Sequence, residues 1–188
     1  KDLDVDGYAI ARHKFLCGPD GAGALYVRKE VFPRILPTYS GVFTDAAHGM
    51  GGKLDLMDTA QRYEVSTRPI PVIMGGTAAL DWFSESVGWD FVYDRLGRLY
   101  DRLWSNLDSN ENVQMISKPG QSGLLTFWVD GVDPTDVVSN LRENYIFGRT
   151  IIVTKPHGIR LSIGVWNRES GIDRIAEVVR SIAKRTSG

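Results

Sequence analysis

Residues 11–28 read ARHKFLCGPDGAGALYVR, and this stretch is the strongest indication of the fold. It places one lysine, Lys14, between two short apolar runs, Asp6 to Ile10 and Ala24 to Val27, each of which is typical of a strand. A proline and three glycines separate the lysine from the second run: Gly18, Pro19, Gly21 and Gly23. Such a run predicts a backbone with unusual dihedral angles that passes close to another group.

Lys14 is the best candidate in the chain for a covalent chemical role. A lysine amine becomes a useful nucleophile toward carbonyl groups when a site holds it partly desolvated, and a Schiff base with an aldehyde cofactor is one outcome. A dipeptide such as His13-Lys14 is by itself more often a solvated turn than a catalytic pair. The glycine-rich context favours the chemical role.

The segment resembles the class V aminotransferase family of fold-type I pyridoxal-phosphate (PLP) enzymes. This family includes isopenicillin-N-epimerase-like proteins, cysteine and cystine C–S lyases, and cysteine desulfurases. Its members have a His-Lys followed by Gly-Pro-x-Gly-x-Gly-x-Leu-Tyr-Val-Arg, which residues 13–28 fit. Two later blocks agree in order: residues 62–67 resemble an Arg-x-Glu-x-Gly-Thr motif, and residues 158–173 resemble the family's C-terminal Ile-Arg-x-Ser block.

The resemblance covers nearly the whole chain and implies an α/β fold, specifically the C-terminal portion of a fold-type I PLP-dependent transferase. We expect residues 1–88 to be the end of the PLP-binding large domain and residues 89–188 to be a small C-terminal α/β domain. The family's pyridine-nitrogen aspartate and first phosphate loop lie before the lysine block. The chain starts too late to contain them, so we expect residues 1–188 alone to be inactive.

Four residues acquire roles from the resemblance. Lys14 would carry PLP, His13 would contact its phosphate, and Thr67 would reach the phosphate of a neighbouring subunit, which implies a homodimer with shared active sites. Arg160 would bind the α-carboxylate of an amino-acid substrate. Its alternative is a structural ion pair, because a guanidinium between apolar neighbours needs an anion. Arg149 is a weaker candidate for the same pocket.

Departures from the family pattern bear on the reaction. Ala11 stands where a phosphate-binding serine is common, and Arg12 could supply a charge instead. No cysteine occurs from residue 146 to 158, where cysteine desulfurases carry their catalytic thiol, and we interpret the single Cys17 as a buried, unreactive thiol. A C–S lyase or epimerase-like enzyme is therefore favoured. The alternatives are a cysteine desulfurase and a non-catalytic fragment or interaction module.

Composition excludes several other classes. With 22 basic and 23 acidic residues the formal charge is −1, which argues against nucleic acid as the main partner. No apolar stretch approaches membrane-spanning length, and one cysteine in 188 residues suits a reducing, cytoplasmic environment.

The remaining elements follow from periodicity. We expect an irregular loop from Phe32 to Pro71, a helix that begins near Gly76 and Thr77, and a second helix after Gly88 with an apolar stripe from Val92 to Leu107. The rest predicts a small α/β unit. Its strands are expected at residues 113–117, 124–129, 151–153 and 159–163, with a helix capped by Asp133 and a last helix that buries Ile172, Ile175, Val179 and Ile182.

Overall fold

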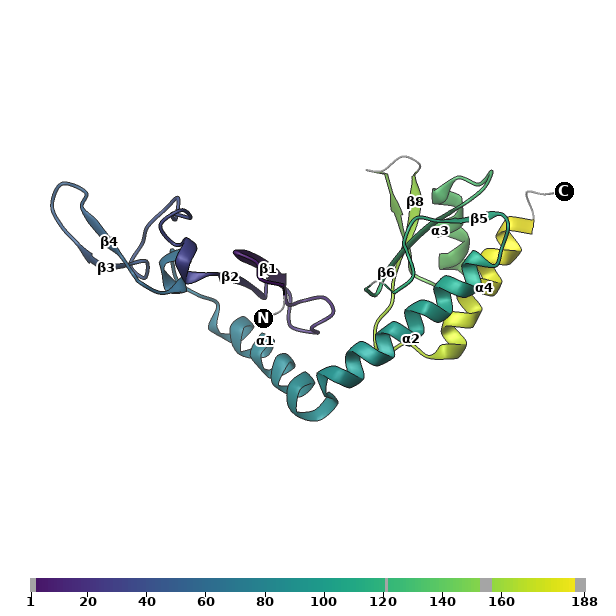
Figure 1. The fold of residues 1–188 in the computed structure, drawn as a ribbon, viewed down its shortest axis with the longest axis horizontal. Helices are drawn as coiled ribbons and strands as arrows, with labels where there is room; N and C mark the ends of the chain where they lie inside the picture. Colours follow the sequence, from purple (N-terminus) through teal and green to yellow (C-terminus); the bar gives the residue numbers. More distant parts are fainter. Residues whose placement is uncertain (1–2, 121, 153–156, 185–188) are drawn as a thin grey trace. The chain divides into compact units, whose positions relative to one another are not determined.

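The computed structural model describes residues 3–120, 122–152 and 157–184. The chain divides into two compact units, Lys1–Val87 and Gly88–Gly188, each of which combines helix and strand (Figure 1). The α/β fold class is therefore confirmed. The boundary falls at Gly88, whose φ of 83° is easily adopted only by glycine.

The first unit is built on two separate antiparallel hairpins and one long helix. Strands β1 (Gly7–Ala11) and β2 (Gly23–Val27) pair with Gly7 opposite Val27 and Ala11 opposite Gly23. The residues between these strands, 12–22, form the loop that carries Lys14. After β2 come a short 3₁₀ turn (Lys29–Val31), β3 (Asp45–His48), β4 (Leu54–Leu56), a second 3₁₀ turn (Ala60–Tyr63), α1 (Ile70–Trp82) and a π-helical turn (Phe83–Val87).

The expectation of an irregular loop from Phe32 to Pro71 is wrong in part. Strands β3 and β4 form a second hairpin within it, with Asp45 paired to Leu56 and His48 to Leu54. The turn between them contains Gly51 and Gly52 at φ of 84° and 78°. These glycines let the chain reverse, a possibility that composition alone did not separate from an open loop.

The expected start of the next helix is also wrong. Helix α1 begins at Ile70, with Pro69 at its N-cap position and Pro71 in its first turn. Proline is well tolerated there because the first amides of a helix have no intrahelical partner. Gly76 and Thr77 lie in the middle of the helix instead of at its start.

The second unit is a four-stranded antiparallel sheet in the order β5-β6-β8-β7. Helix α3 packs against β6, β7 and β8, and α2 packs against α4 (Figure 1). The bounds are α2 Trp89–Asp108, β5 Val113–Met115, β6 Leu124–Val129, α3 Pro134–Glu143, β7 Arg149–Ile151, β8 Gly158–Ser162 and α4 Glu169–Lys184.

Most sequence expectations for this unit are confirmed. The apolar stripe of α2 is buried at Leu99, Leu103 and Leu107, and the Asp133 carboxylate caps α3 by accepting from the Thr135 amide at 2.7 Å. Strand β7 starts at Arg149, two residues earlier than expected, and Val153 lies outside the described residues. Ile175 is half-buried, not buried, because it sits at the edge of the core.

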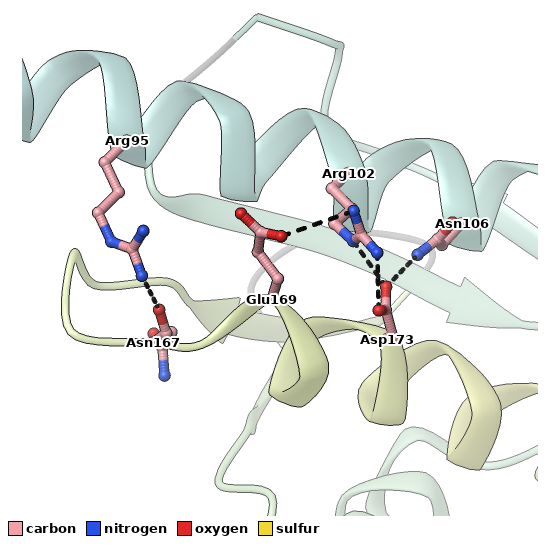
Figure 2. A network of polar contacts seen from close by, with 6 residues as sticks. All are labelled: Arg95, Arg102, Asn106, Asn167, Glu169 and Asp173. Atoms are coloured by element: carbon pink, nitrogen blue, oxygen red, sulfur yellow. Dashed lines mark hydrogen bonds and ion pairs between the residues drawn. The ribbon is translucent and has the colours of Figure 1, made fainter.

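Polar contacts fasten α2 to α4 and to the loop before it (Figure 2). Arg102 donates from Nε and Nη2 to the two carboxylate oxygens of Asp173 at 2.7 and 2.8 Å, and Asn106 donates to the same carboxylate. Arg95 donates to the backbone carbonyls of Val165 and Asn167 at 2.6 and 2.7 Å. The hydrogen bonds from Arg102 hold the pKa of Asp173 below its ordinary value.

Candidate functional site

Lys14 lies on the loop between β1 and β2, and this loop has a defined backbone. The Arg12 amide donates to the Ala22 carbonyl at 3.0 Å, the Gly18 amide to the Arg12 carbonyl at 2.8 Å, and the Cys17 amide to the Lys14 carbonyl at 2.9 Å. The Lys14 side chain is exposed, and no carboxylate in the part of the chain that the structure describes pairs with its amine. The loop therefore presents the Lys14 amine to solvent without a carboxylate partner among the described residues.

His13 is next to this amine, and its exposed ring has no hydrogen-bond partner among the described residues. Thr67 lies just before α1 in the same unit. It is also exposed, and across residues 3–120 its hydroxyl makes no hydrogen bond with His13 or Lys14. His13 and Lys14 are thus chain neighbours on one exposed loop, while Thr67 is a separate exposed hydroxyl.

Arg160 belongs to the second unit, on β8, where it is half-buried. It is paired across the sheet with Thr126 on one side and Arg149 on the other. Its Nε is buried without an acceptor, and within residues 3–120, 122–152 and 157–184 neither arginine has a carboxylate partner. The structural ion pair considered from the sequence is thus absent from the described residues.

The pairing of Arg149 with Arg160 has an electrostatic consequence. Residues directly opposite one another on antiparallel strands share a face of the sheet, and like charges there are destabilising. An anion bound between the two guanidinium groups would remove that repulsion and satisfy the buried Nε of Arg160. The sequence could not show this, because Arg149 and Arg160 become neighbours only through the register of β7 and β8.

The interpretation of Cys17 as a buried thiol is wrong. Cys17 is exposed, and its φ of 54° places it in the left-handed region. Its thiol lies 3.8 Å from the Phe15 carbonyl oxygen. Cys17 lies in the turn after Lys14, where its amide donates to the Lys14 carbonyl, and its side chain is available to solvent instead of packed.

Sequence reasoning also missed two glycines on α1. A Cβ added to Gly75 would lie 3.1 Å from Cγ of Pro19, and one added to Gly76 would lie 3.2 Å from Cζ of Arg12. Both neighbours belong to the loop that carries Lys14. The signal that could have revealed this contact is the Gly-Gly pair itself. Two glycines destabilise a helix, and they are expected there mainly where another chain segment approaches closely.

The described residues hold neither of two other kinds of site. No group of three or more His, Cys, Asp or Glu side chains within the described ranges could hold a metal ion. No described helix combines the length and the apolar character that a membrane span needs.

Comparison with known proteins shows the family to which the chain belongs. The model of the aminotransferase class-V family matches residues 1–175, and the chain belongs to this family. A cysteine desulfurase of Haloferax volcanii is 25% identical over 191 residues, which is 95% of this chain and 44% of that protein.

The fold is also similar to solved structures of PLP-family proteins named below. Two structures of the cystine C–S lyase C-DES, one with its reaction product cysteine persulfide and one with glycine covalently linked to the PLP cofactor, superpose with a TM-score of 0.81 at 28% identity over 95% of this chain. The apo cysteine desulfurase from Thermococcus onnurineus NA1 gives a TM-score of 0.84 at 25% identity over 97% of this chain. The chain covers 46 to 48% of these structures, so it spans less than half the length of its relatives.

Proposed function

We propose that the polypeptide containing residues 1–188 is a PLP-dependent enzyme that acts on an amino acid, with Lys14 as the residue that holds the cofactor. The observation that carries the proposal is the place of Lys14, on a loop closed by three backbone hydrogen bonds in a chain whose residues 1–175 match the aminotransferase class-V family. PLP, when bound, supplies an electron sink for carbanion chemistry. The residues present fit this group, because an aldehyde needs a free amine and no described carboxylate pairs with this one.

The neighbouring side chains have distinct tasks in this proposal. His13 contacts the cofactor phosphate, and the amine of Lys14, once released from the cofactor, moves the proton on the substrate Cα as a general base. Thr67 donates a hydrogen bond to the phosphate of the cofactor that is bound in a second subunit. This role requires a homodimer with shared sites, in which each subunit completes the site of the other.

Arg160 binds the substrate α-carboxylate, with Arg149 beside it. The planar guanidinium of Arg160 offers two parallel donors that match a carboxylate, and its buried Nε lacks an acceptor. The repulsion between Arg149 and Arg160 across the strands supports an anionic ligand on this face.

The reaction that we favour is cleavage of a carbon–sulfur bond by β-elimination. Elimination needs no protein thiol: the Cα proton is removed, the Cβ–S bond breaks, and the sulfur leaves with the electron pair. The relative C-DES is named as a cystine C–S lyase, and the single cysteine of this chain lies three residues after Lys14, not on the β7–β8 connection.

Cysteine desulfuration is the second candidate, and one observation favours it. Cys17 is exposed, so its thiol could accept sulfur, and several relatives are named as cysteine desulfurases. The two candidates give different products. Elimination yields pyruvate and ammonia, whereas desulfuration yields alanine and a persulfide on the protein.

The test uses the full-length protein incubated with PLP. After borohydride reduction, peptide mass spectrometry should find the cofactor on Lys14. With cystine as substrate, we expect pyruvate and a cysteine persulfide, and Cys17→Ser should leave this turnover within about twofold of wild type because an exposed side chain adds little packing. With cysteine as substrate, formation of alanine that disappears in Cys17→Ser would establish desulfuration instead, and absence of cofactor on Lys14 would refute the proposal.

A further inference from the structure

A notch on helix α1 receives the loop that carries Lys14. The notch is the bare backbone at Gly75 and Gly76. A Cβ at Gly18 would lie 2.8 Å from the Arg12 carbonyl oxygen and 3.4 Å from the Gly76 Cα. A Cβ at Gly75 would lie 3.1 Å from Cγ of Pro19. A side chain at Gly75 or Gly76 would therefore press on Pro19 or Arg12 of the loop more tightly than most packed groups do, so the small size of glycine favours this close approach.

The side chain of Arg12 occupies this notch. Its Nε and Cζ both lie 3.2 Å from where a Cβ of Gly76 would be, and its Nη2 donates to the Thr77 hydroxyl at 3.5 Å. That hydroxyl in turn donates to the Ile73 carbonyl at 3.0 Å, so its orientation is fixed by the helix. The guanidinium thus lies across α1 and contacts two consecutive residues of it. The sequence suggested that Arg12 could offer its charge to a phosphate, but in the structure its guanidinium lies against α1.

Arg12 is also where the backbone of the loop closes. Its amide donates to Ala22 and its carbonyl accepts from Gly18, at 3.0 and 2.8 Å. One residue therefore joins both ends of the loop by its main chain and joins the loop to α1 by its side chain. Lys14 is two residues away, inside the segment that these contacts enclose.

Stability does not account for this arrangement. Two glycines in the interior of a helix weaken it relative to alanine. The Nε of Arg12 is buried without an acceptor, which costs further free energy. Both costs fall at the point where the loop meets the helix, and strain that persists at such a point is typical of a functional site.

We propose that Arg12 is a positioning residue: seated in the Gly75–Gly76 notch, it holds the Lys14 loop against α1 and so fixes the place of the reactive amine. The proposal rests on the proposed role of Lys14. It assigns no contact between Arg12 and the cofactor.

The test compares four variants of the full-length protein. Arg12→Ala removes the guanidinium, Arg12→Lys keeps the charge without the planar group, and Gly76→Ala fills the notch while it leaves Arg12 in place. The matched control is Arg28→Ala, which removes an arginine from the end of β2 in the same hairpin, where it pairs with Asp4 at 2.7 Å. The first readout is hydrogen exchange of the Cys17 and Gly18 amides without cofactor. The second is the rate at which PLP is trapped on Lys14 by borohydride.

We expect exchange at both amides to rise about tenfold or more in Arg12→Ala and Gly76→Ala, because the loop opens locally when the contact between Arg12 and α1 is lost. Trapping on Lys14 should slow by a similar factor, Arg12→Lys should not restore it, and the thermal midpoint should change little. Arg28→Ala should alter neither readout. Gly76→Ala is informative because alanine favours the helix, so a faster-exchanging loop cannot result from a weaker α1.

Unchanged exchange in both Arg12→Ala and Gly76→Ala, or equal changes in Arg28→Ala, would overturn the proposal. If wild-type protein were never trapped on Lys14, the proposed function would fail. The exchange measurement would still decide whether Arg12 seats the loop, so the two failures are distinguishable.

Discussion

The two units differ in how they are held together. Among the described residues, the second unit has a continuous buried cluster from Leu99 to Ala183 that includes side chains of every helix and strand except β7. The first has a buried cluster of three residues, Val27, Val31 and Phe32, with Tyr63 packed against it. The second unit is organised by apolar burial, and the first by close backbone contact, turns and hairpins.

The larger buried core therefore lies in one unit and the proposed cofactor lysine in the other. In the first unit, Tyr8, Leu25 and Tyr26 on the β1–β2 hairpin are 53, 53 and 49% exposed. A two-stranded hairpin with both faces uncovered is marginal in water. The hairpin that flanks the proposed cofactor lysine therefore has little buried apolar surface among the described residues.

Replacement of Lys14 should affect catalytic turnover most and the free energy of unfolding least. In the full-length protein, Lys14→Ala should abolish turnover and cofactor trapping, because no other amine occupies the loop, while the free energy of unfolding changes by no more than about 0.5 kcal/mol. Turnover assays and calorimetry measure the two effects. Lys53→Ala, a change at an exposed lysine between β3 and β4, is the control and should affect neither. Normal turnover in Lys14→Ala would refute the assignment.

Separate expression of the units tests the comparison itself. We expect residues 88–188 to unfold cooperatively and to protect amides in β6 and β8, and residues 1–87 to show little protection, since their buried cluster is small. Hydrogen exchange with near-ultraviolet circular dichroism gives the answer. Strong protection of β1 and β2 in isolated 1–87 would show that the first unit is stable without a large core.

A matched pair of core substitutions sharpens the same point. Phe127 is fully buried and Phe32 is 5% exposed, edge-on to Tyr63 with 5.8 Å between ring centroids. Phe127→Ala should destabilise the protein by about 3–5 kcal/mol, the usual cost of emptying a packed core site, and Phe32→Ala by clearly less. Chemical denaturation with one probe in each unit would measure both. Equal losses would contradict the contrast between the units.

A change at Arg160, the proposed carboxylate contact, should have a more moderate effect. Arg160→Lys keeps the charge but loses the planar fork, so binding of amino-acid substrates should weaken by about 1.5–3 kcal/mol, mainly as a raised KM. Cofactor trapping on Lys14 should be unchanged. Amine substrates without an α-carboxylate should be unaffected. An equal loss with these substrates would move the carboxylate contact to Arg149, for which Arg149→Lys is the companion variant.

The smallest effect should come from the contact between α2 and α4. The pKa of Asp173 is lowered by its hydrogen bonds from Arg102, so the charged carboxylate stabilises the folded state at pH values above its ordinary pKa of 3.8. This contribution is lost as the pH falls through the lower folded value. Thermal unfolding from pH 5 to pH 2 should therefore show a weaker pH dependence in Asp173→Asn than in wild type. Asp108→Asn, at the end of α2, should match wild type.

The sequence by itself determined the elements whose signal is local. The apolar period of α2, the Asp133 cap of α3 and the strand at residues 124–129 each depend on residues within one segment, and all three are present. The motif around Lys14 and the two later blocks were sufficient to indicate the family. The roles of Lys14, His13, Thr67 and Arg160 remain predictions from that resemblance.

Only the tertiary structure decided the features that join distant residues. The register of β7 and β8 placed Arg149 opposite Arg160, and the approach of residues 12–19 to α1 explains why Gly75 and Gly76 lie inside a helix. The exposure of Cys17 depended on a positive φ that its sequence neighbours do not require. Periodicity reports which face of a segment is buried, but strand register and close packing are set by side chains more than ten residues apart, so no local pattern contains them.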